Sequence, residues 1–380
     1  MLIILQFYLF ILPFALSLGS PWHAFLHPFY TPSFLTFLGL WISVKGLSLK
    51  KLGSVKFPLL LFFLSMLISV AFSTDRAKSF RELYAYTVAL LLFLVTFSLP
   101  YDDKTRIIKT LLLSGFLVSL LAIHQYFVVF PELINYLKEK KVVDPFLVHF
   151  VSQKRVLFPF TTPNILGGYL SMLLPLTLLL SEGKILILLA LALTLFLTQS
   201  LSGLLSTFFS FAVFFSLKGQ FRKARNLLLL AVVGSAIALI FFLRTARNVE
   251  YLQPFFSWTM RFDYWREAVK IIMAHPLTGV GLGTFDLPQC RFAHNSYLQI
   301  WGEMGILGIV SFLWLLGTVL AGALKRTRNS SHKGTLLLLI TALAAFLFHN
   351  VLDFSFFLPE VCLIGWVLLG LLHSPLPEEI

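Results

Sequence analysis

Long apolar runs follow one another along almost the whole sequence. A helix that crosses a bilayer needs about 20 mostly apolar residues, because only a continuous helix satisfies the backbone's hydrogen bonds inside the membrane. Twelve such runs lie at about 2–19, 29–45, 57–73, 82–99, 107–130, 164–181, 184–199, 200–217, 226–243, 297–323, 334–351 and 356–373. They predict an all-α polytopic membrane protein with about 12 transmembrane helices, folded as one integral membrane domain over residues 1–380.

The composition excludes the two main alternatives, a soluble globular protein and a disordered chain. Of the residues, 58% are hydrophobic and 12% are charged, whereas a soluble domain is about half apolar and a quarter charged. A disordered chain would show the opposite balance. The two cysteines, Cys290 and Cys362, are too few for a disulfide framework or a cysteine-based zinc site.

Basic residues are distributed unevenly between the short loops. If the N-terminus is cytoplasmic, the short cytoplasmic loops hold 16 Lys and Arg, and those on the other side hold only Arg76, Lys78 and Arg81. The positive-inside rule then predicts cytoplasmic N- and C-termini, with the long polar segments 131–163 and 244–296 on the outer side. The formal net charge of +13 fits contact with anionic lipid, and we expect no nucleic-acid partner.

The large loop, residues 244–296, begins with an amphipathic stretch. Its apolar residues recur at helical spacing and predict a helix at about 258–274 along the membrane surface, with Ser257 as N-cap and Pro276 as the stop. Arg261 and Trp265 are four residues apart and share a face of this helix. That pair is either a ligand-binding arginine with its neighbour or a snorkelling arginine beside an interfacial anchor.

Three alternate glycines follow in Gly279-Val280-Gly281-Leu282-Gly283. Glycine permits a tight turn and close backbone approach, so the segment is either a plain turn or a turn that contacts a ligand. A nucleotide-binding loop is excluded because no Gly-Lys-Ser/Thr sequence follows the glycines.

His294-Asn295 stands immediately before the tenth apolar run. The positive end of the helix dipole disfavours an imidazolium there, so we expect a neutral ring that can accept a proton. The alternative is a polar residue at a helix end with no chemical function. A metal site is not expected, because His275 is distant in sequence and no acidic cluster completes a ligand set.

The spacing of these residues resembles the O-antigen ligase and polymerase family. The elements that carry the resemblance are Arg261, Trp265, Pro276, Gly279-x-Gly281, His294-Asn295 and, nine residues on, Gly305-x-x-Gly308. Upstream, Arg155 followed by Pro163-Asn164 resembles the family's Arg…Pro-Asn element at the start of a membrane helix. One position departs from the pattern: Leu201, in Gln199-Ser200-Leu201-Ser202-Gly203, replaces an arginine that relatives often have.

The resemblance implies a function and a location. Members of the family transfer a glycan from undecaprenyl diphosphate to an acceptor hydroxyl at the periplasmic face of the bacterial inner membrane, as inverting, metal-independent glycosyltransferases of the GT-C-like class. The acceptor is lipid A–core in ligases and a growing glycan in polymerases. The expected partners are therefore this donor, lipid A–core or another glycan acceptor, and membrane lipid, with no cofactor.

The resemblance also implies roles for individual residues, and their chemistry fits. An arginine fork pairs two phosphate oxygens and stays charged, which suits Arg155, Arg261 and Arg266 to the donor diphosphate. His294 is the candidate general base for the acceptor hydroxyl. The supporting residues are Asn164, Trp265, Gly279, Gly281, Asn295 and Glu303. Glu303 and Asp353 either face the catalytic cavity or make structural hydrogen bonds.

Two other functions are compatible with the sequence to different degrees. An O-antigen or exopolysaccharide polymerase would share the same motif. A polyprenyl-lipid flippase or another transporter would place ionisable groups deep inside its helices, along the transport path. The predicted spans hold few such groups, which favours the enzyme over the transporter.

Overall fold

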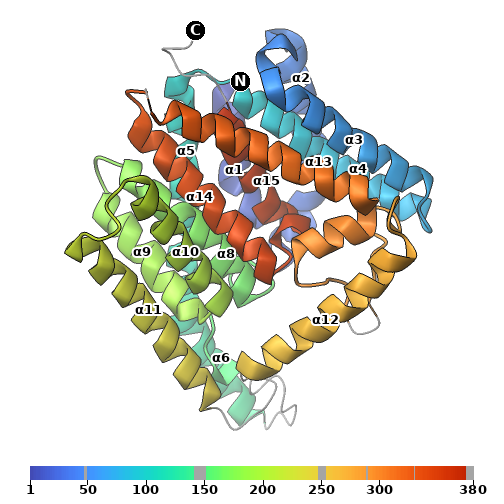
Figure 1. Cartoon of the computed structure of the whole chain (residues 1–380). Helices are drawn as coiled ribbons and strands as arrows, with labels where there is room; N and C mark the ends of the chain where they lie inside the picture. The colour runs from blue at the N-terminus through green and yellow to red at the C-terminus, as the bar shows by residue number, and fades with distance from the viewer. Residues whose placement is uncertain (47–48, 141–150, 247–253, 288–289, 329, 374–380) are drawn as a thin grey trace.

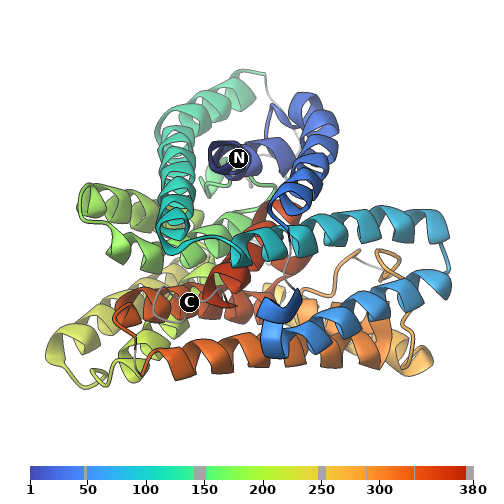
Figure 2. The ribbon, with the colours of Figure 1, turned by 90° about the horizontal axis from the view of Figure 1, so that it is seen from above.

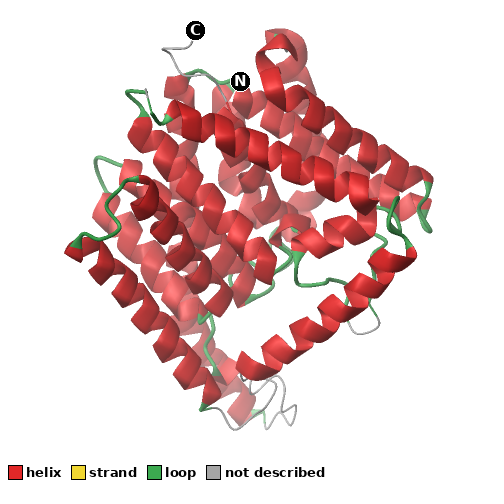
Figure 3. Cartoon of the chain, in the orientation of Figure 1, coloured by secondary structure: helices red, strands yellow, loops and turns green. Residues whose placement is uncertain are grey.

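In the part of the chain that the structure describes, the regular elements are all helical (Figure 3). The computed structural model describes residues 1–46, 49–140, 151–246, 254–287, 290–328 and 330–373. The α-helices are α1 (Leu2–Leu16), α2 (His23–Lys45), α3 (Lys56–Ala71), α4 (Arg76–Phe97), α5 (Tyr101–His124), α6 (Phe130–Glu139), α8 (Pro163–Leu176), α9 (Lys184–Thr198), α10 (Leu201–Leu217), α11 (Ala224–Thr245), α12 (Pro254–Ala274), α13 (Ser296–Arg326), α14 (Lys333–Leu352) and α15 (Pro359–His373). Short helical turns are η1 (Leu49–Val55), η2 (Gln125–Val129), η3 (Thr177–Leu179) and η5 (Ser355–Phe357).

Each of the twelve apolar runs overlaps one helix, namely α1–α5, α8–α11 or α13–α15. Within the described parts of the chain, six helical stretches are long and apolar enough to cross a membrane. These stretches are Leu52–Ala71, Arg76–Phe97, Tyr101–Glu139, Ala224–Thr245, Ser296–Arg326 and Lys333–Leu352. The all-helical fold is confirmed, and the full count of twelve spans stays a prediction.

Two predicted boundaries were wrong. The helix expected to end near residue 130 continues through η2 and α6 to Glu139, because Phe130 and Leu137, seven residues apart on one face, are buried. The amphipathic helix of the large loop starts at Pro254, so Ser257 lies inside α12 and is not its N-cap. The end of α12 at Ala274, two residues before Pro276, agrees with the prediction.

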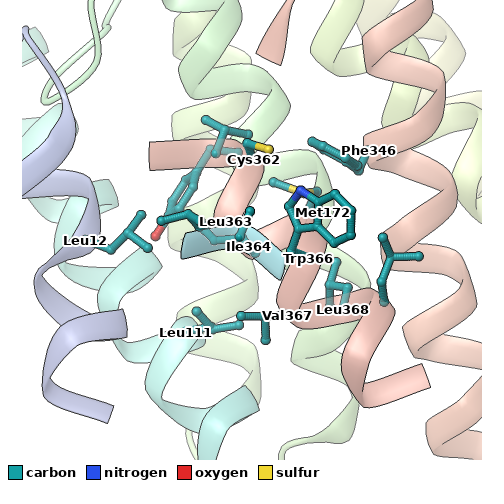
Figure 4. Close-up of a cluster of buried hydrophobic side chains, with 14 of the residues drawn as sticks. Leu12, Leu111, Met172, Phe346, Cys362, Leu363, Ile364, Trp366, Val367 and Leu368 are labelled. Atoms are coloured by element: carbon teal, nitrogen blue, oxygen red, sulfur yellow. The ribbon is translucent and has the colours of Figure 1, made fainter. Parts of the chain in front are cut away.

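Helix α15 forms the centre of the molecule. All its residues from Glu360 to Leu372 are buried, as expected for a helix that is apolar on every side. It packs against α1, α4, α13 and α14. In Figure 4 its side chains lie among Leu12 of α1, Leu111 of α5 and Phe346 of α14.

Most of the other helices are arranged around α15. Figure 1 shows α13 beside α3, and α14 beside α8 and α10, neighbours that also share contacts along their lengths. Seen from above, α1 and α5 lie on the far side of the molecule from α13 (Figure 2). Helix α12 runs from the end of α11 towards the start of α13 and packs against both (Figure 1).

The helix ends form two separate faces. On one face, the Tyr101 hydroxyl lies 3.1 Å from Thr335 Oγ1, and His373 Nε2 lies 3.0 Å from the Leu52 carbonyl oxygen. These contacts join loops that were predicted to be cytoplasmic. On the other face, segments of the large loop contact residues that were predicted to lie outside, as the site below shows. The structure thus separates the two sets of loops, and the assignment of one face to the cytoplasm stays a prediction.

Candidate active site

A small pocket lies where five helices meet. The starts of α8 and α10, the ends of α11 and α14, and the first turns of α12 surround it. It has about 20 Å³ of room for water-sized groups and opens to the surface. The lining residues are Asn164, Leu201, Ser202, Leu205, Arg244, Ser257, Trp258, Arg261 and Leu352. All of them belong to segments that the sequence places on the outer side.

Arg261 is held firmly at the wall of this pocket. Its side chain is buried, and its Nε donates to the Leu352 carbonyl oxygen at 3.0 Å. Its Nη1 donates to Ser257 Oγ at 2.5 Å and to the Ser257 carbonyl oxygen at 3.2 Å. Among the described residues, its Nη2 has no hydrogen-bond partner, so this nitrogen is available to an anion in the pocket.

Arg155 stands behind the pocket instead of lining it. One of its terminal nitrogens donates to Asn164 Oδ1 at 3.2 Å, and its Nε donates to the Thr198 carbonyl oxygen at 3.0 Å. Asn164 follows Pro163 in the first turn of α8, where the Thr162 side chain caps the helix. The structure therefore brings Arg155 to Asn164, the two ends of the motif, and Asn164 is the member that reaches the pocket. The diphosphate-binding role expected for Arg155 stays a prediction.

Arg266 is not brought to the pocket. It lies five residues after Arg261 on α12, which rotates it by roughly 140° around the helix. Its side chain is 70% exposed and forms an ion pair with Asp263 at 3.3 Å. Trp265 packs edge-on against Phe262, with ring centroids 5.4 Å apart. The predicted diphosphate-binding role of Arg266 has no support from its position.

His294 lies at the start of α13 against a carboxylate. The Asn295 side chain caps α13 by accepting from the backbone N–H groups of Tyr297 and Leu298 at 3.0 and 3.1 Å. The backbone of His294 is in the left-handed region, with φ of 49°. Its Nδ1 lies 3.8 Å from Asp353 Oδ1, the separation of an ion pair that is longer than a hydrogen bond.

The environment of His294 changes its charge. Burial lowers the pKa of its imidazole, but the Asp353 carboxylate and the Cys290 sulfur outweigh burial and raise that pKa to about 9. Reciprocally, burial raises the pKa of Asp353, yet His294 brings it down to about 2. The expected neutral ring was wrong, because the helix dipole is a weaker influence than a buried carboxylate at this distance.

The ring of His294 is also fixed in orientation by two aromatic side chains. Tyr264 of α12 stacks on it with centroids 5.5 Å apart. The edge of Phe354 packs against it at 4.8 Å. With 24% of the side chain exposed, the imidazole is accessible but confined, as a group that transfers a proton to or from a bound molecule must be.

The pocket and His294 are joined by two consecutive residues. The Leu352 carbonyl accepts from Arg261, and Asp353, the next residue, contacts His294. This link brings the guanidinium and the imidazole to neighbouring residues at the end of α14. Asp353 was recognisable in the sequence only as an isolated acidic residue at the end of an apolar run.

The glycine turn (Gly279 to Gly283) packs against Glu303 of α13. The N–H of Gly281 donates to the Glu303 carbonyl oxygen at 3.2 Å, and the N–H of Gly283 donates to Glu303 Oε2 at 2.9 Å. A Cβ at Gly279 would collide with the backbone of Glu303. The Gln299 side chain donates to Glu303 Oε1 at 3.0 Å. Of the two roles considered, the structure supports a turn without ligand contact, and Glu303 makes structural hydrogen bonds.

A comparison with known families gives a match over part of the chain. Residues 186–313 match the model of the family described as O-antigen ligase. This segment of the chain, about a third of its length, is similar to the O-antigen ligase family. The matched segment contains Leu201, Arg244, Arg261 and His294, whereas Asn164 and Asp353 lie outside it. No curated protein matches the chain. The family match and the apolar helices together indicate a multi-pass membrane protein with an O-antigen ligase or polymerase-type function in general terms.

Proposed function

We propose that the chain is an O-antigen ligase-like glycosyltransferase that moves a glycan from undecaprenyl diphosphate to an acceptor hydroxyl of lipid A–core at the periplasmic face. The observation that carries the proposal is the Leu352-Asp353 segment, where Leu352 accepts a hydrogen bond from Arg261 and Asp353 contacts His294. A cation for a leaving diphosphate and a base for an incoming hydroxyl are the two groups that such a transfer needs.

The donor would approach the pocket from the lipid. Helix α11, which ends at the pocket, exposes apolar side chains such as Val232, Leu239 and Phe242 along its length. A polyprenyl tail can lie along this apolar surface while the diphosphate enters the polar pocket. There Arg261 Nη2 can donate to a phosphate oxygen, and the guanidinium keeps its charge throughout the reaction.

The transfer itself is a single displacement. The acceptor oxygen attacks the anomeric carbon while the bond from that carbon to the diphosphate oxygen breaks, and the electron pair leaves with the diphosphate. His294 accepts the hydroxyl proton, and Asp353 stabilises the imidazolium that forms. Attack opposite the leaving group inverts the anomeric configuration. Arg261 neutralises the developing phosphate charge, so the step requires neither a general acid nor a metal ion.

The direct test is transfer in a purified system. The protein in lipid nanodiscs should convert an undecaprenyl-diphosphate glycan and lipid A–core into glycosylated lipid A–core and free undecaprenyl diphosphate. Extension of a second donor glycan without use of lipid A–core would instead assign a polymerase. Movement of the intact donor across a bilayer, with no new glycosidic bond, would assign a flippase and contradict the proposal.

The periplasmic location of the site needs its own test. In a background with Cys290 replaced by serine, which leaves only the buried Cys362, a cysteine added at position 140 or 286 should react with a membrane-impermeant thiol reagent in spheroplasts. A cysteine at position 222 should stay unlabelled until the membrane is opened. The reverse pattern would invert the proposed orientation.

A further inference from the structure

Cys290 lies beside His294 and has no role in the mechanism above. Its Sγ is 3.8 Å from His294 Nε2, within the distance at which sulfur hydrogen-bonds. The other ring nitrogen, Nδ1, is 3.8 Å from Asp353 Oδ1. A thiol, an imidazole and a carboxylate therefore form one chain of contacts with the imidazole in the middle. In such a chain a base activates a nucleophile, while the third group orients the base.

The surroundings of Cys290 favour its reactive form. The hydrogen bond with the His294 ring lowers the pKa of the thiol and outweighs burial, which raises that pKa. The Asp286 carboxylate also raises it, by less. Protonation of the ring is favoured by Asp353 and opposed by Arg261 of α12. An imidazolium beside a thiol stabilises the thiolate, which is the nucleophilic form of cysteine.

Cys290 is also accessible to a small reagent. The residue is partly exposed, and two backbone hydrogen bonds with Leu287, at 3.1 and 3.3 Å, hold it in place. Cys362, the other cysteine of the chain, is buried in α15 and only 6% exposed. The chain thus contains an accessible thiol beside an imidazole and a buried thiol with which it can be compared.

A group attached to Cys290 would obstruct His294. Asp353 lies at Nδ1, so Nε2 is the nitrogen that can accept a proton from a bound hydroxyl, and Cys290 Sγ lies at this nitrogen. Tyr264 stacks on the ring, and the edge of Phe354 packs against it, so the ring has little freedom to turn away. A substituent of several atoms on Sγ therefore occupies the space through which a hydroxyl reaches Nε2.

We propose that Cys290 is a covalent modification site, at which exchange with a small disulfide forms a mixed disulfide and stops glycan transfer. The thiolate of Cys290 attacks one sulfur of the disulfide, and the S–S bond breaks. The electron pair of that bond leaves with the second sulfur, which takes a proton from the His294 imidazolium. The products are a mixed disulfide at Cys290, a free thiol and a neutral His294, and excess thiol reverses the exchange. The loss of transfer rests on the proposed function, whereas the reactivity of Cys290 does not.

The first test measures the reactivity of the thiol. The protein in nanodiscs is treated with oxidised glutathione, and the adducts are located by mass spectrometry. One adduct should form, at Cys290, and Cys362 should stay free. At about pH 7 the adduct should form about tenfold more slowly in His294→Ala, because an ordinary thiol is only a few per cent ionised there. At about pH 10 both thiols are ionised, so the two rates should converge.

The second test measures glycan transfer after the same treatment. Transfer by the parent protein should fall by about tenfold or more, because the base no longer reaches the acceptor, and should return with dithiothreitol. In Cys290→Ser, transfer should proceed at the same rate with and without oxidised glutathione. Cys362→Ser is the matched control and should remain as sensitive to the disulfide as the parent.

The outcomes separate this inference from the proposed function. Equal adduct rates in the parent and His294→Ala at about pH 7, or an adduct at Cys290 that leaves transfer unchanged, would overturn the inference. If His294→Ala does not accumulate, His294→Gln, which is polar but uncharged, should slow the adduct equally, and a parent-level rate would overturn the inference. Absence of transfer by the untreated parent would contradict the proposed function instead, and the adduct rates decide the reactivity of Cys290 in either case.

Discussion

The glycine turn and the His294 segment belong to the same loop but use their backbones in opposite ways. In the turn, Gly281 and Gly283 donate their N–H groups to Glu303, and close packing leaves no space for side chains. At His294, a non-glycine residue adopts a left-handed backbone, and its side chain contacts Asp353 and remains accessible. The glycine turn is therefore filled by packing contacts, whereas the His294 segment exposes a side chain that can exchange a proton.

The comparison divides a single motif into two kinds of residue. Gly279, Gly281 and Glu303 position the loop on α13, whereas Arg261 lines the pocket and the accessible His294 contacts Asp353. Substitutions in the first group should reduce the amount of folded protein. Substitutions in the second should leave the fold intact and reduce the chemistry. Each prediction below tests this division, from the largest expected effect to the smallest.

The largest effect is expected at His294. His294→Ala should reduce transfer by about a hundred- to ten-thousandfold, the usual range for loss of a general base, while donor binding persists on the arginines. Single-turnover transfer and donor titration measure the two quantities separately. His275→Ala, an exposed histidine of the same loop, is the control and should have parent activity. Equal loss of binding and transfer would make His294 a donor ligand.

Asp353 should set the pH range in which His294 works. The base must be neutral, and its pKa is about 9, so activity of the parent enzyme should rise with pH up to that value. In Asp353→Asn the carboxylate is lost, and burial, the largest remaining influence, holds the pKa of His294 below 6.5. The rising part of the pH–activity profile of the variant should therefore lie at a pH lower by more than about two units. If the rising part of the pH–activity profile did not move, Asp353 would not set the pKa of the catalytic base. If the activity of the parent enzyme fell above pH 9, the catalytic form of His294 would be the imidazolium.

Arg261→Lys tests whether the fork matters as well as the charge. The lysine cannot make the bonds to Leu352 and Ser257 and still reach the diphosphate, so donor affinity should fall by about tenfold to a hundredfold. Arg266→Lys, on the exposed side of the same helix, should bind the donor normally. Near-parent affinity in Arg261→Lys would reduce Arg261 to an interfacial anchor.

Gly279→Ala should affect stability and leave the chemistry unchanged. Its φ of 70° and its contact with the Glu303 backbone should together cost about 1–3 kcal/mol of folding free energy, seen as a lower midpoint of thermal unfolding in detergent. Transfer per folded molecule should be retained. Gly317→Ala, with no atom near the added Cβ, is the control. Loss of transfer at unchanged stability would place the turn among the reacting residues.

Local features of the sequence predicted most of the helices. An apolar run long enough to cross a bilayer must be helical, because no water is present to satisfy its backbone. The boundary at residue 130 was predicted wrongly because α6 is stabilised by a partly buried face and not by a membrane-length run. The Asn295 cap and the end of α12 before Pro276 follow from short-range chemistry, and both agree with the structure.

What the sequence determined by itself was therefore the helical membrane fold, the family motif and the candidates Arg261 and His294. The tertiary structure alone decided that Asp353 contacts His294, that Arg266 faces away from the pocket, and that Arg244 faces into it. The physical reason is the distance along the chain over which each property is decided. Helix formation and capping depend on neighbours within a few residues of the sequence. The charge of a buried histidine depends instead on which groups lie within a few ångströms in space. Asp353 reaches His294 only because α14 ends beside the start of α13.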